Sequence, residues 1–340
     1  MDSNQIASEY HDLNGNHIDV LDEPPTALEF SRLAHISRPA LIRGMQIPSV
    51  RSWDNESLAA AMGNAKISVA VTPNGRADAV TRAPDGKLYF VEPHVEQMSI
   101  SDLFSKLSGG MTLERNICNS FIHDWPMIEN DDSDVYYLQS QNGNVYSSRF
   151  FEGTRDPSEF EALRADIPSE IPWCSEAFGR PPDAVNLWIG SHNSVTSIHS
   201  DPYENIYTVV RGSKQFTLLP PTEGSYLRER MYPHGTWTRQ GTEAGLTLTP
   251  STNAPPIRWS SVIDPDIPGN LPPDAHPICI TLEPGETLYL PPGWWHHVRQ
   301  TNNTIALNWW YDMEMRGMAW VLLSFLRGVG TVPSGNDEDA

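Results

Sequence analysis

The sequence is poor in cysteine and in long apolar runs. Its 340 residues include three cysteines, Cys118, Cys174 and Cys279, which lie far apart and form no CxxC pair. A sparse, odd set predicts buried free thiols in a reducing compartment, not a disulfide framework. The first residues lack the basic and apolar segments of a signal peptide. The longest apolar stretch, Met318 to Leu326, is far too short to span a bilayer. We therefore expect a protein of the cytoplasm or nucleus, without membrane contact.

Basic residues are also scarce. Lysine and arginine number 23 against 43 aspartates and glutamates, and the formal net charge is -20. A chain with this balance lacks the basic surface that phosphate backbones require, which excludes a general nucleic-acid partner. Most of the acidic side chains are accounted for by solubility. Their excess is also compatible with a cationic protein partner.

The abundant residues indicate many short strands around a substantial core. Hydrophobic residues make up 39% of the chain, with 29 prolines and 23 glycines to form turns. After residue 183 about eight strand patterns follow one another, the number in a double-sheet jelly roll. We predict a mainly β, cupin-like double-stranded β-helix with flanking α-helices and an α+β N-terminal region. The predicted strands cover residues 185–189, 194–199, 205–210, 214–219, 278–282, 287–290, 295–300 and 304–310.

The remaining segments are predicted from the same patterns. Arg211 to Ser213 is expected to turn a hairpin between two of the strands, and Pro157 to Asp166 to form a polar helix. Residues 315–327 are apolar nearly all round, which predicts a helix buried against its own chain or in a homodimer. The predicted boundaries are a loosely ordered N-terminus at 1–22, a supporting α/β region at 23–182, the barrel at 183–314 with an irregular insert over one mouth at 220–277, a helix at 315–328 and a solvated acidic tail at 331–340.

One motif places two types of metal ligand on the same side of a strand. A single residue separates His199 from Asp201, and strand side chains two apart point to the same face. Another strand of the set contains His296 and His297, of which only one can face the same way; the uncertain register leaves both open. Two histidines and a carboxylate favour non-haem Fe(II) and oxygen chemistry. The alternative is a chance H-x-D pair among ordinary core or surface histidines.

Lys214 is a second unusual residue of the predicted barrel. It opens a strand directly after the predicted hairpin turn. A lysine inside a barrel costs free energy unless an anion pairs with it. The dicarboxylate 2-oxoglutarate would supply that anion, with one end on the metal and the other at Lys214. A solvent-facing lysine is the alternative.

Longer motifs resemble Jumonji-C hydroxylases. Two segments outside the metal motifs, 69–80 and 306–314, resemble in particular the lysyl hydroxylase family called jumonji domain-containing protein seven. The likeness covers nearly all of residues 25–328. The motifs that carry it are Asn186-Leu187-Trp188-Ile189-Gly190, Thr196-x-x-His199-x-Asp201-x-x-x-Asn205, Gly212-x-Lys214 and Leu288-Tyr289-Leu290-Pro291-x-x-Trp294-Trp295-His296-His297.

The resemblance implies a role for each matching residue. It makes His199, Asp201 and His296 the ligands of a catalytic Fe(II), with 2-oxoglutarate and O2 as co-substrates. It places Lys214 at the distal carboxylate of 2-oxoglutarate. It makes Tyr137 and Thr196 hydroxyl donors to that carboxylate. It places the amides of Asn205 and Asn308 and the aromatic wall of Trp310 around the co-substrate, and the amide of Gln139 near the substrate. Ordinary core or strand roles are the alternatives for Tyr137, Thr196 and Trp310.

The implied reaction is hydroxylation of a lysine side chain at C3. The family substrate that this resemblance implies is a developmentally regulated GTP-binding protein. One alternative is an N-methyl-lysine demethylase, which uses the same iron chemistry and releases formaldehyde. Another is an endopeptidase, although the sequence offers neither a nucleophile–base pair nor an H-E-x-x-H motif. The third is a non-catalytic cupin binding module, against which the complete set of ligand types argues.

Overall fold

The computed structural model describes residues 3–108, 134–139, 143–241, 244–328 and 331–337. Of the three cysteines, Cys118 lies outside these ranges. Cys174 is buried, as expected, whereas Cys279 is exposed. The expectation of a buried thiol is wrong at Cys279 because it points outward from its strand. Within the described ranges, no helix combines the length and apolar content needed to cross a bilayer.

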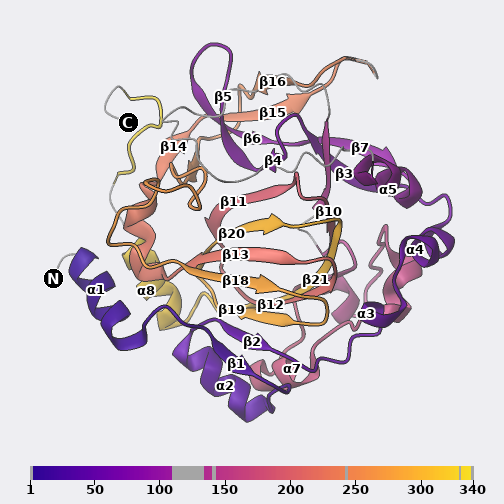
Figure 1. Cartoon of the computed structure of the whole chain (residues 1–340), viewed down its shortest axis with the longest axis horizontal. Coiled ribbons are helices and arrows are strands. Elements are labelled where there is room, and N and C mark those ends of the chain that lie inside the picture. Colours follow the sequence, from indigo (N-terminus) through magenta and orange to yellow (C-terminus); the bar gives the residue numbers. More distant parts are fainter. Residues whose placement is uncertain (1–2, 109–133, 140–142, 242–243, 329–330, 338–340) are drawn as a thin grey trace.

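Eight of the strands between residues 184 and 312 form a barrel of two four-stranded sheets. One sheet has the spatial order β19 (Thr287–Leu290), β12 (Tyr203–Arg211), β21 (Thr304–Asp312), β10 (Ala184–Gly190). The other has the order β18 (Ile278–Leu282), β13 (Lys214–Leu219), β20 (Trp295–Gln300), β11 (Val195–Ser200). Figure 1 shows these strands stacked in the centre of the molecule. The predicted jelly-roll class is confirmed.

Both sheets continue past the barrel with strands from the N-terminal region. The first sheet, which we call the major sheet, gains β1 (Asp19–Leu21) and β2 (Ala40–Ile42) beside β19, and β8 (Val135–Gln139), β3 (Ile67–Thr72), β7 (His94–Met98) and β9 (Tyr146–Ser147) at the β10 side. The second sheet gains β4 (Arg76–Ala77), which pairs in parallel with β11. The supporting region is therefore continuous with the barrel.

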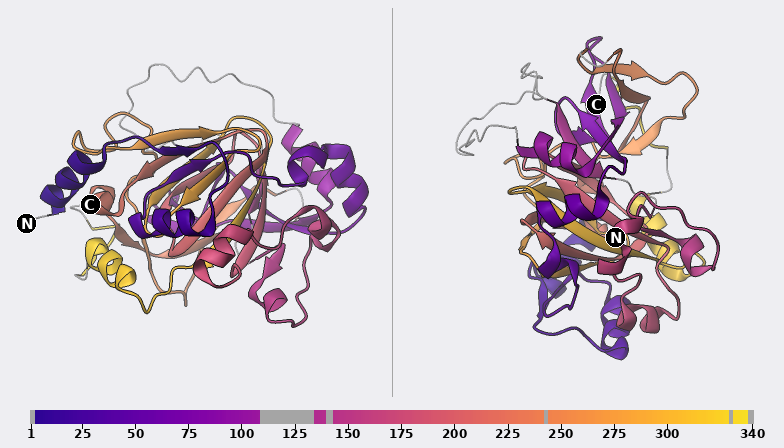
Figure 2. Two further views of the ribbon diagram at one scale, coloured as in Figure 1. Left: turned by 90° about the horizontal axis from the view of Figure 1, so that it is seen from below. Right: turned by 90° about the vertical axis from the view of Figure 1, so that its right-hand side faces the viewer.

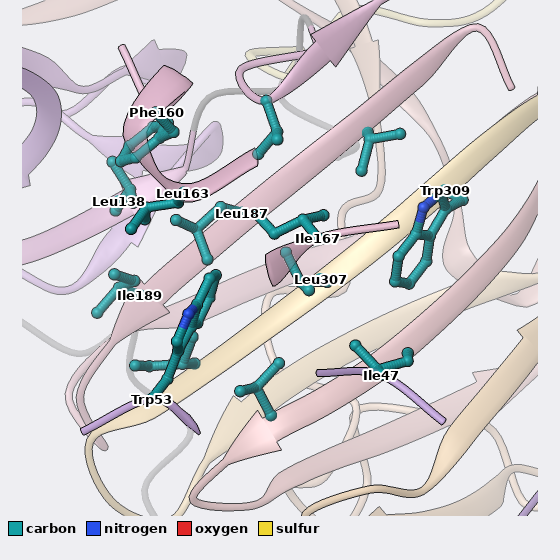
Figure 3. Close-up of a cluster of buried hydrophobic side chains, with 14 of the residues drawn as sticks. Ile47, Trp53, Leu138, Phe160, Leu163, Ile167, Leu187, Ile189, Leu307 and Trp309 are labelled. Atoms are coloured by element: carbon teal, nitrogen blue, oxygen red, sulfur yellow. The ribbon is translucent and has the colours of Figure 1, made fainter. Parts of the chain in front are cut away.

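The central strands of the major sheet are buried on both faces. In β10, Leu187 and Ile189 point outward into one apolar cluster, whereas Trp188 points into the barrel. In β21, Leu307 and Trp309 likewise point outward. Alternation along each strand thus divides one sequence between two environments. The outer cluster is shown in Figure 3, where Trp53, Phe160, Leu163 and Ile167 pack against these strands.

The N-terminal helices cover the outer face of the major sheet. The first of them starts at Thr26, whose side chain and Glu29 form a capping box. Asp54 caps another helix in the same way, with Ser57 as its partner. The expected polar helix at Pro157 to Asp166 is shorter, a 3-10 helix that begins at Glu161, and the Ser158 hydroxyl before it donates to the Asn144 carbonyl. The elements of this layer are α2 (Ala27–Ile36), α3 (Ser49–Ser52), α4 (Asn55–Met62), α5 (Ile100–Ser108), α6 (Ser148–Phe151), η1 (Glu161–Asp166) and α7 (Pro172–Phe178).

The hairpin predicted around Arg211 to Ser213 is wrong. β12 belongs to the major sheet and pairs with β19 and β21, whereas β13 pairs with β18 and β20 in the second sheet. The turn at Gly212, with φ 74°, carries the chain from one sheet to the other. By sequence, two strands with a short turn between them fit either a hairpin within one sheet or a connection between two sheets. Packing of the core between the two sheets favours the connection.

The insert at 220–277 is more regular than expected. It contains η2 (Pro221–Leu227), β14 (Arg230–Tyr232), β15 (His234–Thr238), β16 (Thr247–Pro250) and β17 (Ile257–Trp259). β15 and β16 join β5 (Ala79–Arg82) and β6 (Leu88–Glu92) in a four-stranded sheet, and β14 pairs with β17. Figure 1 shows this sheet beside β4 and β11, at one edge of the barrel. The sequence pattern did not indicate these strands, because β15 of the insert pairs with β6, in a distant part of the chain.

Both ends of the chain are better ordered than predicted. Residues 3–14 form α1 (Ser3–Asn14), and the Arg38 guanidinium donates to the backbone oxygens of Asn14 and His17 at 2.8 and 2.9 Å. The loosely ordered N-terminus is thus a wrong prediction. In the tail, residues 331–337 lie against the insert, and the Asn336 side chain exchanges two hydrogen bonds with the backbone of Leu88. The polar composition of these segments concealed contacts made across long sequence distances.

The last helix, α8 (Met318–Arg327), is not buried by the described chain. Met318, Leu322 and Phe325 are 68%, 58% and 67% exposed. Figures 1 and 2 show α8 near α1 at one end of the barrel, and Arg327 anchors it through Glu229 at 2.6 Å. Burial of this apolar helix against its own chain is therefore excluded for the described residues. The homodimer alternative stays a prediction.

Candidate metal centre and co-substrate site

The structure brings His199, Asp201 and His296 together from two neighbouring strands. His199 lies on β11 opposite His296 on β20, and Asp201 directly follows β11. The nearest Asp201 carboxylate oxygen is 3.7 Å from the Nε2 atom of each histidine. Their ligand atoms all lie within 4.8 Å of one another, so that a single cation can bind all three. His296, the first of the adjacent histidines, is the one that faces this cluster.

The hydrogen bonds of the two rings fit a metal site. His199 Nδ1 donates to the Ser197 carbonyl at 2.8 Å, and His296 Nδ1 donates to the Trp294 carbonyl at 3.0 Å. Because a carbonyl can only accept, each Nδ1 carries the proton in the neutral ring and each Nε2 presents a lone pair toward Asp201. Two neutral imidazoles and one carboxylate on a shared face suit Fe(II) with further positions open.

The pKa values of the three side chains also suit the binding of a cation. Burial and the proximity of His199 lower the pKa of His296 to about 4, so that its imidazole is neutral at physiological pH. Burial would raise the pKa of Asp201, but the two histidines hold it below its usual value. Burial opposes protonation of His199, yet the Asp201 carboxylate raises its pKa. A proton is therefore held more readily on His199 than on His296, and a metal bound at the His199 Nε2 would displace it.

His297 points to the opposite side of β20 and belongs to a second cluster, with Asp264 and Asp266. We call this the outer cluster. Its carboxylates already have cationic partners: Asp264 pairs with Arg76 at 3.2 Å and with Arg299, and Asp266 pairs with Arg299 at 3.0 Å. Guanidinium groups occupy the positions that a metal would need. The outer cluster is an ion-pair network that ties the insert to the barrel wall.

Lys214 lies inside the barrel and not at its surface. Its side chain is 1% exposed, and its ammonium donates to the Tyr137 hydroxyl at 3.0 Å. Among the described residues it has no carboxylate partner, and burial lowers its pKa to about 7. Thr196 is hydrogen-bonded to Tyr137 in turn. A buried lysine beside two hydroxyls provides the donors that one end of a dicarboxylate requires.

The predicted amides form a buried chain across the major sheet. Asn308 Nδ2 donates to Asn205 Oδ1 at 3.0 Å. Asn308 Oδ1 accepts from Asn186 at 3.2 Å and from the Trp188 indole at 2.8 Å. These bonds hold Asn205 in a fixed orientation on the major sheet, across the barrel from the sheet that carries the metal ligands. Trp310, opposite Asn205 on β21, stacks on Tyr203 with ring centroids 4.9 Å apart. Its buried indole nitrogen has no hydrogen-bond partner among the described residues.

Sequence reasoning missed Gln300. It lies directly opposite Lys214 on the neighbouring strand and is 6% exposed. Neither its amide nitrogen nor its oxygen has a hydrogen-bond partner among the described residues. A Cβ added at Gly190 would lie 2.5 Å from that nitrogen, so that only glycine leaves room for it. Such a buried, unpaired amide fits a polar ligand held by Lys214 and Tyr137. Its position opposite Lys214 depends on the cross-strand register, which the sequence leaves uncertain.

Gln139 and two residues not singled out from sequence border the metal end. Gln139 Nε2 donates to the Asp78 carboxylate at 3.0 Å. Asp78 lies between β4 and β5, in the segment beside β11. Trp259, from β17 of the insert, lies parallel to the His199 ring with centroids 5.8 Å apart. The insert therefore covers the metal end of the barrel, as the sequence predicts, but with an ordered aromatic side chain.

Comparison with known proteins decides the family. Residues 25–317 match the family described as the cupin-like domain. The human bifunctional peptidase and (3S)-lysyl hydroxylase JMJD7 is 35% identical over 86% of this chain and 84% of its own length. The Arabidopsis thaliana lysine-specific demethylase JMJ32 is 32% identical over 93% of this chain and 87% of its own length. This chain belongs to the cupin-like JmjC family.

Further similarity agrees with that assignment. JmjC domain-containing protein E of Dictyostelium discoideum is 32% identical over 90% of this chain and 86% of its own length. JmjC proteins of this kind are Fe(II)- and 2-oxoglutarate-dependent oxygenases, acting as hydroxylases or demethylases. In this JmjC chain the His199, Asp201 and His296 cluster fits the metal, and the residues around Lys214 fit the co-substrate.

Proposed function

We propose that this JmjC protein is a lysyl hydroxylase that oxidises C3 of a lysine in a developmentally regulated GTP-binding protein. The observation that carries the oxygenase assignment is the pairing of two sites within one barrel. Three metal-ligand groups converge at one end, and Lys214, buried with no carboxylate partner among the described residues, lies further along the same sheet. The choice of a lysine hydroxylase draws on the human relative, whose name includes (3S)-lysyl hydroxylase.

Each group of residues has a distinct task in this proposal. His199, Asp201 and His296 would hold Fe(II), which supplies the oxygen activation and the oxidative decarboxylation of 2-oxoglutarate. Protonated Lys214, Tyr137 and Thr196 bind the distal carboxylate. The fixed amide of Asn205 and the wall of Trp310 orient the co-substrate. Burial of these groups excludes water from the reaction.

The main rival is demethylation of an N-methyl-lysine. It draws on the Arabidopsis relative, which is named as a lysine-specific demethylase. Both reactions use the same metal and co-substrate and both act on a lysine side chain. They differ in product: hydroxylation adds one oxygen to the protein, whereas demethylation removes a methyl group and releases formaldehyde. The peptidase activity in the human relative's name is a third candidate.

One experiment separates these functions. The purified protein is incubated with Fe(II), 2-oxoglutarate, ascorbate and a developmentally regulated GTP-binding protein. We expect mass spectrometry to find one added oxygen on a lysine, with succinate formed in step and no formaldehyde. Formaldehyde release from an N-methylated substrate would favour the demethylase, and cleaved backbone the peptidase. Absence of succinate with every candidate substrate would favour a non-catalytic cupin module.

We also propose a homodimer in which α8 forms the interface, because this helix has an exposed apolar face. Trp320, Leu322 and Phe325 are 38%, 58% and 67% exposed, more apolar surface than a monomer's helix ordinarily presents. Sedimentation of the wild type should give a dimer, and Phe325→Asp should give a monomer. A monomeric wild type would reject this arrangement.

A further inference from the structure

A carboxylate beside the metal cluster has no cationic partner. Asp78 follows β4, which pairs in parallel with β11, the strand that carries His199. The Asp78 carboxylate makes no ion pair in the described parts of the chain, and Gln139 donates a hydrogen bond to it at 3.0 Å. It is close enough to raise the pKa of His199 without pairing with it. Asp78 therefore borders the reacting end of the barrel.

Two other partly buried carboxylates of this protein have their charge balanced by arginine, whereas Glu204 is bound by the Tyr289 hydroxyl. Asp156 pairs with Arg164 at 2.7 Å, and Glu229 pairs with Arg258 at 2.8 Å. Asp78 instead has a second carboxylate, Glu92, in its surroundings, and burial together with Glu92 raises its pKa to about 6. A half-buried carboxylate in this setting is stabilised by an incoming cation. The nearby His199 cannot serve as that cation in the loaded protein, because a metal bound at its Nε2 would take the place of the proton.

The backbone holds Asp78 in an unusual conformation. Its φ is 51°, in the left-handed region that non-glycine residues seldom occupy and that aspartate and asparagine tolerate best. Such conformations cost free energy and are concentrated at functional sites. Here the turn between β4 and β5 places the carboxylate within reach of Gln139. The position of this charge is thus fixed by the fold.

An aromatic side chain flanks the same histidine. Trp259 is half-buried and lies parallel to the His199 ring, at 8°. Phe90 supports it with a centroid distance of 4.7 Å. A flat apolar surface next to a carboxylate suits a side chain with an aliphatic stem and a cationic end. Among protein side chains, lysine has that chemistry with a compact ammonium.

We propose that Asp78 is the specificity residue that binds the protonated ε-amino group of the substrate lysine, with Gln139 orienting its carboxylate and Trp259 lying against the aliphatic stem. This inference rests on the proposed lysine-directed function. Asp78 acts on substrate binding and not on the metal. Because the Asp78 carboxylate lies beside the metal ligands and is not one of them, it would hold the amino group at a distance from the metal. A carbon of the aliphatic stem, and not the amino end, would then face the metal.

Asp78→Asn is the informative substitution. Asparagine has the same shape, tolerates a positive φ and can still accept from Gln139 through its amide oxygen, so that the charge alone is removed. Asp274→Asn is the matched control, because Asp274 is exposed on the insert and loses the same charge. Asp78→Glu retains the charge at a longer reach and should restore part of the binding. Fe(II) affinity is measured for all of them.

The binding test uses two small probes with the protein loaded with Fe(II) and 2-oxoglutarate without oxygen. Nα-acetyl-lysine N-methylamide carries the ammonium, and Nα-acetyl-norleucine N-methylamide replaces it with a methyl-terminated stem. We expect the wild type and Asp274→Asn to bind the lysine probe about tenfold more tightly than the norleucine probe in an NMR titration. Asp78→Asn should remove that preference and leave Fe(II) affinity unchanged.

The outcomes separate this inference from the proposed function. A wild type without preference for the lysine probe, or a preference that survives in Asp78→Asn, overturns the role of Asp78. Weakened Fe(II) binding with the preference intact would also overturn it and make Asp78 a counter-charge for the metal. If the preference depends on Asp78 but no lysine of the GTP-binding protein gains oxygen, the proposed substrate reaction fails while the ammonium site stands. With a protein substrate, Asp78→Asn should raise KM more than it lowers kcat.

Discussion

The two histidine–carboxylate clusters of this JmjC protein contain adjacent histidines, but only one of the clusters is suited to bind a metal. His296 points to one side of β20 and joins His199 and Asp201, whereas His297 points to the other side and joins the outer cluster. Both clusters offer imidazole and carboxylate groups within metal-binding distance of one another. In the part of the chain that the structure describes, guanidinium groups, those of Arg76 and Arg299, pair with the outer cluster and not with the inner one.

The difference shows that ligand types alone do not make a metal site. In the outer cluster the arginines already neutralise the carboxylates, so that a metal would have to displace or repel them. In the inner cluster both imidazoles are oriented by backbone carbonyls, and no described lysine or arginine pairs with Asp201. What distinguishes a metal centre here is an unpaired carboxylate between rings of fixed tautomer.

The largest expected effect comes from removing one carboxylate from each cluster. Asp201→Ala should abolish Fe(II)-dependent conversion of 2-oxoglutarate to succinate, because the metal loses its only anionic protein ligand. Asp266→Ala should leave the rate per folded molecule within about twofold, since its partners lie outside the barrel. Succinate is measured for both variants. Equal rates for Asp201→Ala and wild type would refute the metal assignment.

Lys214→Met tests the other charge inside the barrel. Loss of the ammonium should raise the KM for 2-oxoglutarate by about two orders of magnitude, because the distal carboxylate would be buried without a cation. Arg299→Met, which removes a cation outside the barrel, should leave that KM unchanged. Steady-state kinetics with varied 2-oxoglutarate measure both. A similar rise in the two variants would indicate a general loss of structure.

The same lysine predicts a pH dependence of stability without co-substrate. Burial lowers the pKa of Lys214 from 10.5 to about 7, so between these values the unfolded chain holds a proton that the folded protein has released. The contribution of this group to the free energy of unfolding therefore increases as pH rises from about 7 toward 10.5. In denaturant titrations, Lys214→Met should lack this increase. An identical pH profile for the two proteins would contradict the neutral, buried lysine.

Arg299→Met should weaken the outer cluster and reduce stability without touching the chemistry. The substitution removes a partner from the carboxylates of Asp264 and Asp266, which should lower the free energy of unfolding by about 1–3 kcal/mol. Chemical denaturation gives that value, and succinate formation should match wild type at a temperature where the variant is folded. A lost metal-dependent rate would show that the two sides of β20 are coupled.

The smallest effect is expected at Gln300. Gln300→Leu removes an amide without a described partner, so it should raise the KM for 2-oxoglutarate by about tenfold and leave the ligand-free protein as stable as wild type or more so. Kinetics and denaturation are measured together. Loss of stability with an unchanged KM would mean that Gln300 serves the fold and not the co-substrate.

Much of the site could be predicted because strand alternation is local. The separation of His199 and Asp201 by one residue fixes their common face. The position of Lys214 at a strand start left a barrel lysine and a solvent-facing lysine as alternatives, and the structure decides for the barrel. The resemblance selected His296 from the adjacent pair, which spacing alone could not. Gln300 and Asp78 were missed because their surroundings come from strand register and from a turn between two short strands.

The sequence by itself determined the fold class, the family and the residue types of the metal cluster, since these follow from local periodicity and from motifs of contiguous residues. Only the tertiary structure decided that β12 and β13 belong to different sheets, that α1 docks and that α8 is left exposed. It also decided that Asp78 has no cationic partner within the described ranges, while Asp264 has two. These facts depend on which distant segments meet, and the free energy of such contacts is invisible in any short stretch of chain.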